Sequence, residues 1–171
     1  MLRRLAPVLL AVIALANGET WTGKVVGVQD GDTITILREG RQARVRLDGV
    51  DCPELGQPFG RNARERVSVL AFGKVVTVRQ KAASVGRDRY GRVLGQVSLP
   101  DGRNLNRLLV AEGLAWWYRR YAPRDAVLAG LEERAREAGL GLWADADPEP
   151  PWLWRAQRRK RVVDEAAGRL E

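Results

Sequence analysis

The chain has 171 residues, with 29 lysines and arginines against 21 acidic residues and a formal net charge of +8. It contains no histidine and one cysteine, which excludes histidine general bases, histidine-metal sites, intrachain disulfides and cysteine zinc clusters. An enzyme made from this chain must use carboxylates, arginines, lysines, tyrosines and hydroxyls. Of these, carboxylates with arginine around Ca²⁺ or Mg²⁺ are the set suited to phosphate esters.

The N-terminal residues have the pattern of an export signal. A basic start at Arg3 and Arg4 precedes an apolar run over residues 5–15 and an A-x-A site at residues 14–16, which predicts cleavage after Ala16. Left uncut, the segment would be a membrane anchor, although the run is short for a membrane span. We therefore expect export to the periplasm or the medium, with no stable membrane association after cleavage. Loss of the two arginines lowers the net charge from +8 to +6.

Short segments rich in Val, Ile and Thr follow and predict a β-domain. Five predicted strands cover residues 23–28, 33–37, 42–47, 74–79 and 92–99. A D-G step at residues 30–31 predicts a hairpin turn between the first two strands. In the third, Val45 and Leu47 lie on one face while Arg44 and Arg46 lie on the other.

Three helices are predicted between and after these strands, over residues 60–72, 104–112 and 124–138. Apolar residues at helical spacing mark the first and the third, and Gly139 ends the third. We therefore expect a mainly β, α+β domain over residues 17–143: a five-stranded OB-type barrel with about three helices.

Residues 144–171 differ in composition and predict a proline-containing basic C-terminal extension. The P-E-P-P stretch at residues 148–151 is expected to hold the basic residues that follow it off the barrel. These residues are Arg155, Arg158, Arg159, Lys160 and Arg161. Two interpretations stay open, a solvated disordered end or an arm that binds phosphates.

Acidic residues gather at residues 46–54, which read R-L-D-G-V-D-C-P-E. Asp51 and Glu54 have the spacing of a helix capping box, but Gly56 and Pro58 would stop such a helix after about one turn. The other interpretation is a proline-stiffened turn that holds oxygen ligands close together, as a hard cation requires.

Four motifs in order resemble those of the thermonuclease family, the staphylococcal-nuclease-like enzymes. They are D-G-D-T (30–33), V-R-L-D-G-V-D-C-P-E (45–54), D-R-Y-G-R (88–92) and N-R-L-L-V-A-E-G-L-A-W (106–116). Each motif alone is a weak signal, and the four in register are a strong one. The resemblance implies an OB-type barrel and a Ca²⁺-dependent phosphodiesterase that cleaves DNA and RNA with low sequence preference, leaving 3′-phosphate ends.

The resemblance also implies a role for each matching residue. Asp32 and Asp51 match the calcium-binding aspartates, and the backbone carbonyl of Cys52 matches a further ligand. Glu54 matches the glutamate that activates the attacking water. The phosphate-clamping arginines are matched by Arg46 and Arg92. Each of these could instead be a turn or solvated strand residue, and their joint occurrence favours the site.

Substrate contacts are harder to align. The family places tyrosines after the G-L-A segment, and here Tyr118 and Tyr121 are the candidates, with Arg89 as a further one. Packing against the barrel is the other explanation for the aromatic residues.

Two functions follow from the sequence. The first is a monomeric, secreted, calcium-dependent nuclease whose partners are DNA and RNA, with single strands preferred. The alternative is a catalytically silent OB module that binds single-stranded nucleic acid. Degeneration would show as lost carboxylates or arginines, and here all five side-chain positions are filled, which favours the enzyme.

Overall fold

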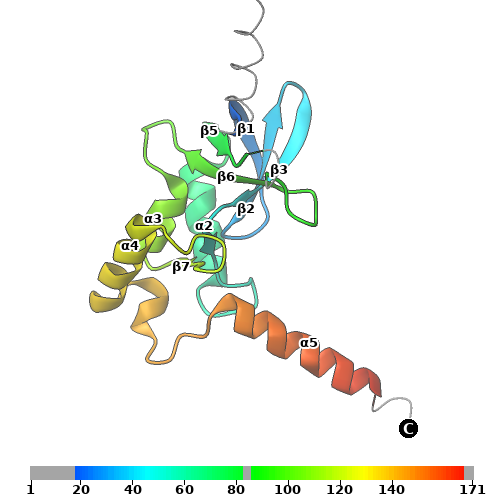
Figure 1. Cartoon of the computed structure of the whole chain (residues 1–171), viewed down its shortest axis with the longest axis vertical. Coiled ribbons are helices and arrows are strands. Elements are labelled where there is room, and N and C mark those ends of the chain that lie inside the picture. The colour runs from blue at the N-terminus through cyan, green and yellow to red at the C-terminus, as the bar shows by residue number, and fades with distance from the viewer. Residues whose placement is uncertain (1–17, 83–85, 168–171) are drawn as a thin grey trace, which may run out of the picture.

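The computed structural model describes residues 18–82 and 86–167 (Figure 1). The predicted export signal at residues 1–16 lies outside these residues, and its cleavage stays a prediction. Among the helices of the described residues, none combines the length and the apolar character needed to cross a bilayer.

Five strands close into a barrel, as predicted. They are β1 (Thr20–Val28), β2 (Thr33–Arg38), β3 (Arg41–Leu47), β5 (Val75–Gln80) and β6 (Val93–Ser98). The order around the barrel is β1-β2-β3-β6-β5, and β5 pairs with β1 to close it. All pairings are antiparallel except that of β3 with β6. Closure pairs both edges of every strand and leaves no long free edge.

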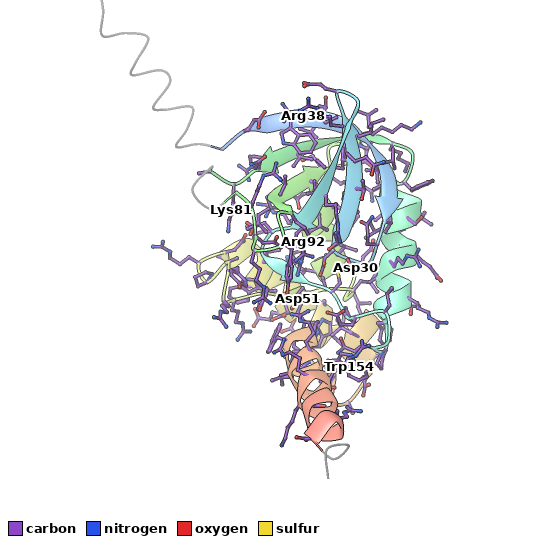
Figure 2. All side chains as sticks on the ribbon, turned by 90° about the vertical axis from the view of Figure 1, so that its right-hand side faces the viewer. Asp30, Arg38, Asp51, Lys81, Arg92 and Trp154 are labelled. Carbon is purple, nitrogen blue, oxygen red and sulfur yellow. The ribbon has the colours of Figure 1, made fainter. Side chains whose placement is uncertain are left out.

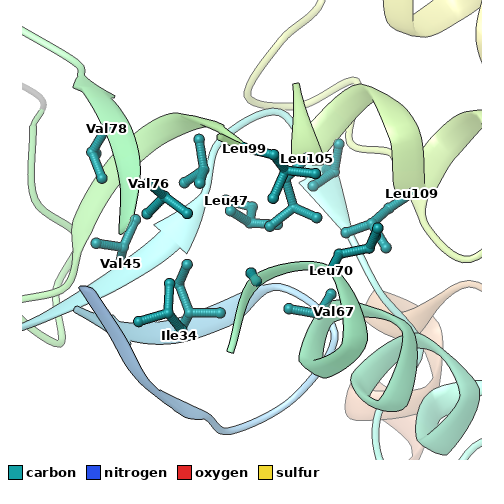
Figure 3. Close-up of a cluster of buried hydrophobic side chains, with 14 of the residues drawn as sticks. Ile34, Val45, Leu47, Val67, Leu70, Val76, Val78, Leu99, Leu105 and Leu109 are labelled. Atoms are coloured by element: carbon teal, nitrogen blue, oxygen red, sulfur yellow. The ribbon is translucent and has the colours of Figure 1, made fainter. Parts of the chain in front are cut away.

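The barrel interior is filled by aliphatic side chains on alternating strand positions. Figure 3 shows Ile34, Val45, Val76 and Val78 converging between the strands, and each is at most 1% exposed. The alternation predicted for β3 is confirmed, since Val45 and Leu47 are buried and Arg44 is exposed. The polar face of β3 is thereby free to carry a site.

Three helices match the predicted ones, with ends that differ by at most two residues. They are α2 (Gly60–Ala71), α3 (Leu105–Ala111) and α4 (Ala126–Glu137). The side chains of Asn104 and Asp125 accept hydrogen bonds from the first amides of α3 and α4, which explains where these helices begin. The α2 helix buries Ala63, Val67 and Leu70.

Three short elements were not predicted. Strand β4 (Val50–Asp51) pairs antiparallel with β7 (Trp116–Trp117), which sets Asp51 opposite Trp116. A single 3-10 turn, η1 (Gly141–Ala144), follows α4. Elements this short have no periodic pattern in the sequence.

The C-terminal segment forms the fourth α-helix of the described residues, α5 (Pro151–Ala167). It is therefore not the disordered end that was one of the two interpretations of its sequence. A proline at the first helical position suits a helix start, because its missing N–H has no partner there anyway. Figure 1 shows α5 beginning beside the domain and projecting away from it. The expectation that the linker holds Arg155 off the barrel is wrong, because the first turns of α5 pack back on the domain. The boundary at residue 143 stays a prediction.

Candidate active site

The predicted site residues come together at one end of the barrel, between the barrel and the start of α5. Figure 2 shows Asp30, Asp51 and Arg92 in this region. Asp32 directly precedes β2, and the β2–β3 register pairs Thr33 with Arg46. Pairing of the two strands therefore places the Asp32 carboxylate beside the Arg46 guanidinium.

Arg46 bridges the two predicted metal ligands. Its Nε lies 3.1 Å from Oδ1 of Asp32, and its Nη2 donates to Oδ1 of Asp51 at 2.8 Å. Its Nη1 donates to the carbonyls of Leu47 and Val50, each at 2.8 Å. Burial alone would lower the pKa of Arg46, but the charges of Asp32 and Asp51 raise it above its ordinary value. The guanidinium thus stays charged and organises the site, and its contact with a phosphate stays a prediction.

Backbone and hydroxyl donors hold the two aspartates in place. Oδ2 of Asp32 accepts from the amide of Cys52 at 2.8 Å, and its Oδ1 accepts from the Thr33 hydroxyl at 3.2 Å. The Asp51 side chain is 1% exposed. Burial raises the pKa of Asp51, against the hydrogen bond from Arg155 and the charge of Arg46. The negative charge of Asp51 therefore depends on these arginines or on another cation.

Asp30 completes the acidic region. Its Oδ1 accepts from the amide of Asp32 at 3.0 Å, which is turn chemistry. Burial, and next the charge of Asp32, raise the pKa of Asp30 to about 6.

The Asp30→Asn variant should therefore change the pH dependence of stability in the metal-free protein. The folded protein holds the Asp30 proton more tightly than the unfolded chain, so the free energy of unfolding falls as pH rises from about 4 to about 6, and the loss persists above pH 6. The shift corresponds to up to about 3 kcal/mol at pH 7, which Asp30→Asn should recover, with little effect at pH 4. Urea unfolding in chelator across pH 4–8 measures this. The exposed Asp147, as Asp147→Asn, is the charge-matched control and should follow the parent.

The donor set fits a hard divalent cation. Asp32 and Asp51 offer carboxylate oxygens beside one guanidinium, and the charge of Asp32 raises the pKa of both Asp51 and Asp30. A cation would offset this repulsion. Within residues 18–82 and 86–167, no three Asp, Glu, Cys or His side chains form a ready metal cluster. A bound ion would thus need the Cys52 carbonyl, water and substrate as additional ligands.

Cys52 itself is not a nucleophile. Its side chain is buried, and burial, followed by the charge of Asp32, raises the pKa of its thiol well above the ordinary value. This agrees with a role for its backbone alone.

Glu54 lies on a turn and not in a capping box, because Asp51 belongs to β4 and the next helix starts only at Gly60. Its side chain is 38% exposed. Gln57 holds the turn. Its side-chain Oε1 accepts a hydrogen bond from the backbone amide of Glu54 at 2.9 Å, and its backbone amide donates to the Glu54 carbonyl at 2.8 Å. The carboxylate is therefore positioned by the turn and still reachable from solvent.

Arg92 joins the site through Thr33. Its Nη1 donates to the Thr33 hydroxyl at 3.1 Å, and that hydroxyl donates to Asp32. Its Nε and Nη2 both lie 2.7 Å from Oδ2 of Asp88. Burial raises the pKa of Asp88, but the hydrogen bonds from Arg92 outweigh it and leave this pKa below its ordinary value. Asp88 is thus the orienting partner of Arg92.

Comparison with known sequences identifies the family. The family described as "Staphylococcal nuclease homologue" matches residues 44–145. The chain belongs to the staphylococcal nuclease family. A protein of Escherichia coli named as an uncharacterized endonuclease is 46% identical over 136 residues, which cover 80% of this chain and 86% of the relative. A protein of Shigella flexneri named micrococcal nuclease is 40% identical over 163 residues, or 90% of this chain and 91% of the relative.

In this nuclease-family chain, the candidate substrate-binding residues do not form one cluster. Tyr118 follows β7, and its amide donates to the Gly49 carbonyl at 2.9 Å, which keeps it near β4. Its ring lies 4.9 Å from that of Tyr121, centroid to centroid. Arg89 donates to the hydroxyl of Tyr90 at 2.7 Å on an exposed turn. Trp116 is buried, so core packing is the correct explanation for that residue.

A groove of about 430 Å³ opens beside Tyr118. It is lined by aromatic and charged side chains, namely Trp116, Trp117, Tyr118, Arg119, Arg120, Glu132, Arg136 and Trp152. Aromatic faces beside arginines are what single-stranded bases and phosphates bind.

Arg155 of α5 is the site residue that sequence reasoning missed. Its Nη2 donates to Oδ2 of Asp51 at 2.7 Å, and its Nη1 donates to Oε1 of Glu54 at 2.8 Å and to Oδ1 of Asp51 at 3.3 Å. No local pattern signals contacts across 101 and 104 residues of chain.

Proposed function

We propose that this chain is a calcium-dependent nuclease that hydrolyses phosphodiester bonds of DNA and RNA with low sequence preference and leaves 3′-phosphate ends. One observation carries the proposal: the five side chains assigned from the sequence lie in one cluster joined by hydrogen bonds and ion pairs. Its links are Arg92 to Thr33 to Asp32, Arg46 between Asp32 and Asp51, and Arg155 between Asp51 and Glu54. Membership of a nuclease family supports the same conclusion.

Asp32, Asp51 and the Cys52 carbonyl would hold the Ca²⁺ ion. The bound ion supplies charge neutralisation at the phosphate. Arg46 holds the two carboxylates close together, since its Nε contacts Asp32 and its Nη2 contacts Asp51. Cys52 helps from the backbone, because its amide fixes the Asp32 carboxylate.

Glu54 is the proposed general base. Its partly exposed carboxylate would accept a proton from water as the water oxygen bonds to phosphorus and the P–O5′ bond breaks, and the leaving 5′-oxygen would take a proton from solvent to become a hydroxyl. Arg92 would donate to the phosphate oxygens and stabilise their extra charge in the transition state. Asp88 and Thr33 already hold this guanidinium in one orientation, which reduces the cost of positioning it.

The competing function is a silent OB module that binds single-stranded nucleic acid. The filled cluster and the half-exposed Glu54 favour the enzyme. We further propose that the protein is an exported monomer, and the signal pattern of residues 1–16 supports the export. We also propose that it prefers single strands, which its basic charge and the groove beside Tyr118 support.

The decisive test is incubation of the mature protein with single-stranded DNA in Ca²⁺ and then in chelator. Activity should require Ca²⁺ and vanish in chelator, and Asp32→Asn and Asp51→Asn should each raise the Ca²⁺ concentration needed. Asp125→Asn, at the start of α4, is the control for loss of one carboxylate. Full activity without a divalent metal would overturn the site assignment.

Arg92→Lys should lower turnover by about 10²-fold, because lysine keeps the charge but lacks the planar fork that meets two phosphate oxygens. Single-turnover rates on a single-stranded oligonucleotide measure this. Arg107 is exposed on α3, and Arg107→Lys is the matched control that should keep the parental rate. A parental rate in Arg92→Lys would remove Arg92 from the phosphate clamp.

The exposed basic side chains of α5 should add salt-dependent binding without sequence preference. Arg155 is engaged in the site, so the arm starts at Arg158 and Arg159, both exposed. Each neutralised phosphate contributes about 0.7 units to the slope of log affinity against log salt concentration. Replacing both arginines by Gln should therefore flatten this slope by at most about 1.4 units. Binding of single-stranded DNA in a Glu54→Gln background measures this.

The control for that experiment is the double variant Arg41→Gln and Arg44→Gln, which removes two exposed charges from β3. It should leave the slope nearly unchanged. Equal slopes for all three proteins would assign α5 to a merely solvated helix.

A further inference from the structure

We propose that the first turns of α5 are an autoinhibitory cover, formed by Trp152 and Arg155, that must leave the site before Ca²⁺ and nucleic acid can bind. This inference rests on the proposed function, because it assigns the same carboxylates to Ca²⁺ and the same aromatic surface to nucleotides. It goes beyond that function by adding a regulatory contact made by the chain itself.

The first part of the cover is a cation placed where the metal is expected. The Arg155 guanidinium contacts both oxygens of Asp51, at 2.7 and 3.3 Å, and Glu54 at 2.8 Å. A metal ion on Asp51 and a water on Glu54 need these same oxygens. Coordination of Ca²⁺ by Asp51 at its usual 2.3–2.6 Å would bring the ion against the guanidinium, so the two cations compete.

The second part covers the nucleotide surface. The rings of Trp152 and Tyr118 are parallel within 1°, with centroids 5.3 Å apart. Trp152 also meets Trp116 edge-on at 5.6 Å. A base that stacked on this face of Tyr118 would have to displace Trp152, because one ring face accepts one partner.

The chain just before α5 is tied to the catalytic turn. Nε2 of Gln57 donates to the Glu149 carbonyl at 2.9 Å, while Oε1 of the same side chain accepts from the Glu54 amide. Pro151 is buried at the start of the helix. The cover is thus held at high effective concentration beside the site it closes.

Two features of α5 would allow the cover to leave the site. The Arg155 side chain remains 34% exposed, against 12% for Arg46, so water can reach its ion pairs and replace them. Farther along α5, Arg158, Arg159, Lys160 and Arg161 are exposed and would attract a polyanion. Figure 2 shows α5 starting at the site near Asp51 and extending away from it, so a nucleic acid could bind the far part of the helix before it displaces the near part.

Competition lowers the apparent metal affinity in proportion to the open fraction. If about one tenth of the molecules are open, Ca²⁺ binds about tenfold more weakly than it would to an uncovered site. By linkage, bound Ca²⁺ must destabilise the docked helix by the same factor.

The test is the Ca²⁺ dissociation constant of the full chain by calorimetry, without nucleic acid. Arg155→Gln should bind Ca²⁺ about tenfold more tightly than the parent. Arg107→Gln, which removes the same charge from an exposed position on α3, should bind as the parent does. Amide hydrogen exchange gives a second readout, and Ca²⁺ should speed exchange in the first turns of α5 in the parent.

The outcomes separate the inference from the proposed function. Equal affinities in the parent and Arg155→Gln, with binding lost in Asp51→Asn, would overturn the cover and keep the metal site. A similar gain in Arg155→Gln and Arg107→Gln would also overturn the cover, since net charge alone would explain it. Absence of Ca²⁺ binding to every variant would overturn both proposals.

Discussion

Glu54→Gln is expected to lower turnover by about 10²- to 10⁴-fold, the range for loss of a general base, while nucleic-acid binding persists. Glutamine keeps the shape of the side chain and can still accept the hydrogen bond from Arg155. It cannot take the proton of an attacking water at neutral pH. Binding should persist because the backbone amide of residue 54, and not the Glu54 carboxylate, anchors the turn through Gln57.

The measurement pairs single-turnover cleavage of a single-stranded oligonucleotide in Ca²⁺ with binding of the same oligonucleotide by fluorescence anisotropy. Glu137→Gln, at an exposed position on α4, is the matched control and should cleave at the parental rate. Near-parental cleavage by Glu54→Gln would refute its role as base. Joint loss of cleavage and binding would instead indicate a damaged site.

Arg46→Met should lower the free energy of unfolding of the metal-free protein by about 3–5 kcal/mol. The substitution leaves Asp32 and Asp51 buried without the cation that contacts both, and it also removes the donor to the Leu47 and Val50 carbonyls. The loss is large beside a total stability of about 5–15 kcal/mol for an ordinary domain. Added Ca²⁺ should recover part of it, because the two carboxylates are the proposed ligands and the ion would replace the lost positive charge.

Urea unfolding in chelator, with and without added Ca²⁺, measures both effects. Arg44→Met on the same strand is the control, since Arg44 is exposed and its loss should change stability by less than about 0.5 kcal/mol. Equal losses in the two variants would show that Arg46 does not hold the aspartates together.

Much of the fold could be predicted because its signals are local. The alternation in residues 42–47 follows from strand geometry and needs no partner strand to be recognised. Asn104 and Asp125 mark helix starts through hydrogen bonds to amides two or three residues away. Strands β4 and β7 escaped prediction because two residues carry no period, and only their pairing defines them.

The candidate site divides in the same way. Asp32, Arg46, Asp51, Glu54 and Arg92 could be assigned from motifs, since each stands in a short stretch that the family shares. Their partners could not be assigned so readily. The capping-box alternative for Asp51 and Glu54 was excluded only when the structure placed Asp51 in β4, and the pairing of Asp88 with Arg92 depends on how that turn closes.

By itself, the sequence determined the barrel, three of the helices, the family and the five candidate residues of the site, because these depend on patterns within a few residues of one another. Only the tertiary structure decided that the two aspartates share Arg46, that burial beside Asp32 raises the pKa of Asp30, and that α5 returns Arg155 to the site. The physical reason is distance along the chain. Contacts between residues 101 or 104 positions apart arise from packing of whole elements, which no local sequence pattern encodes.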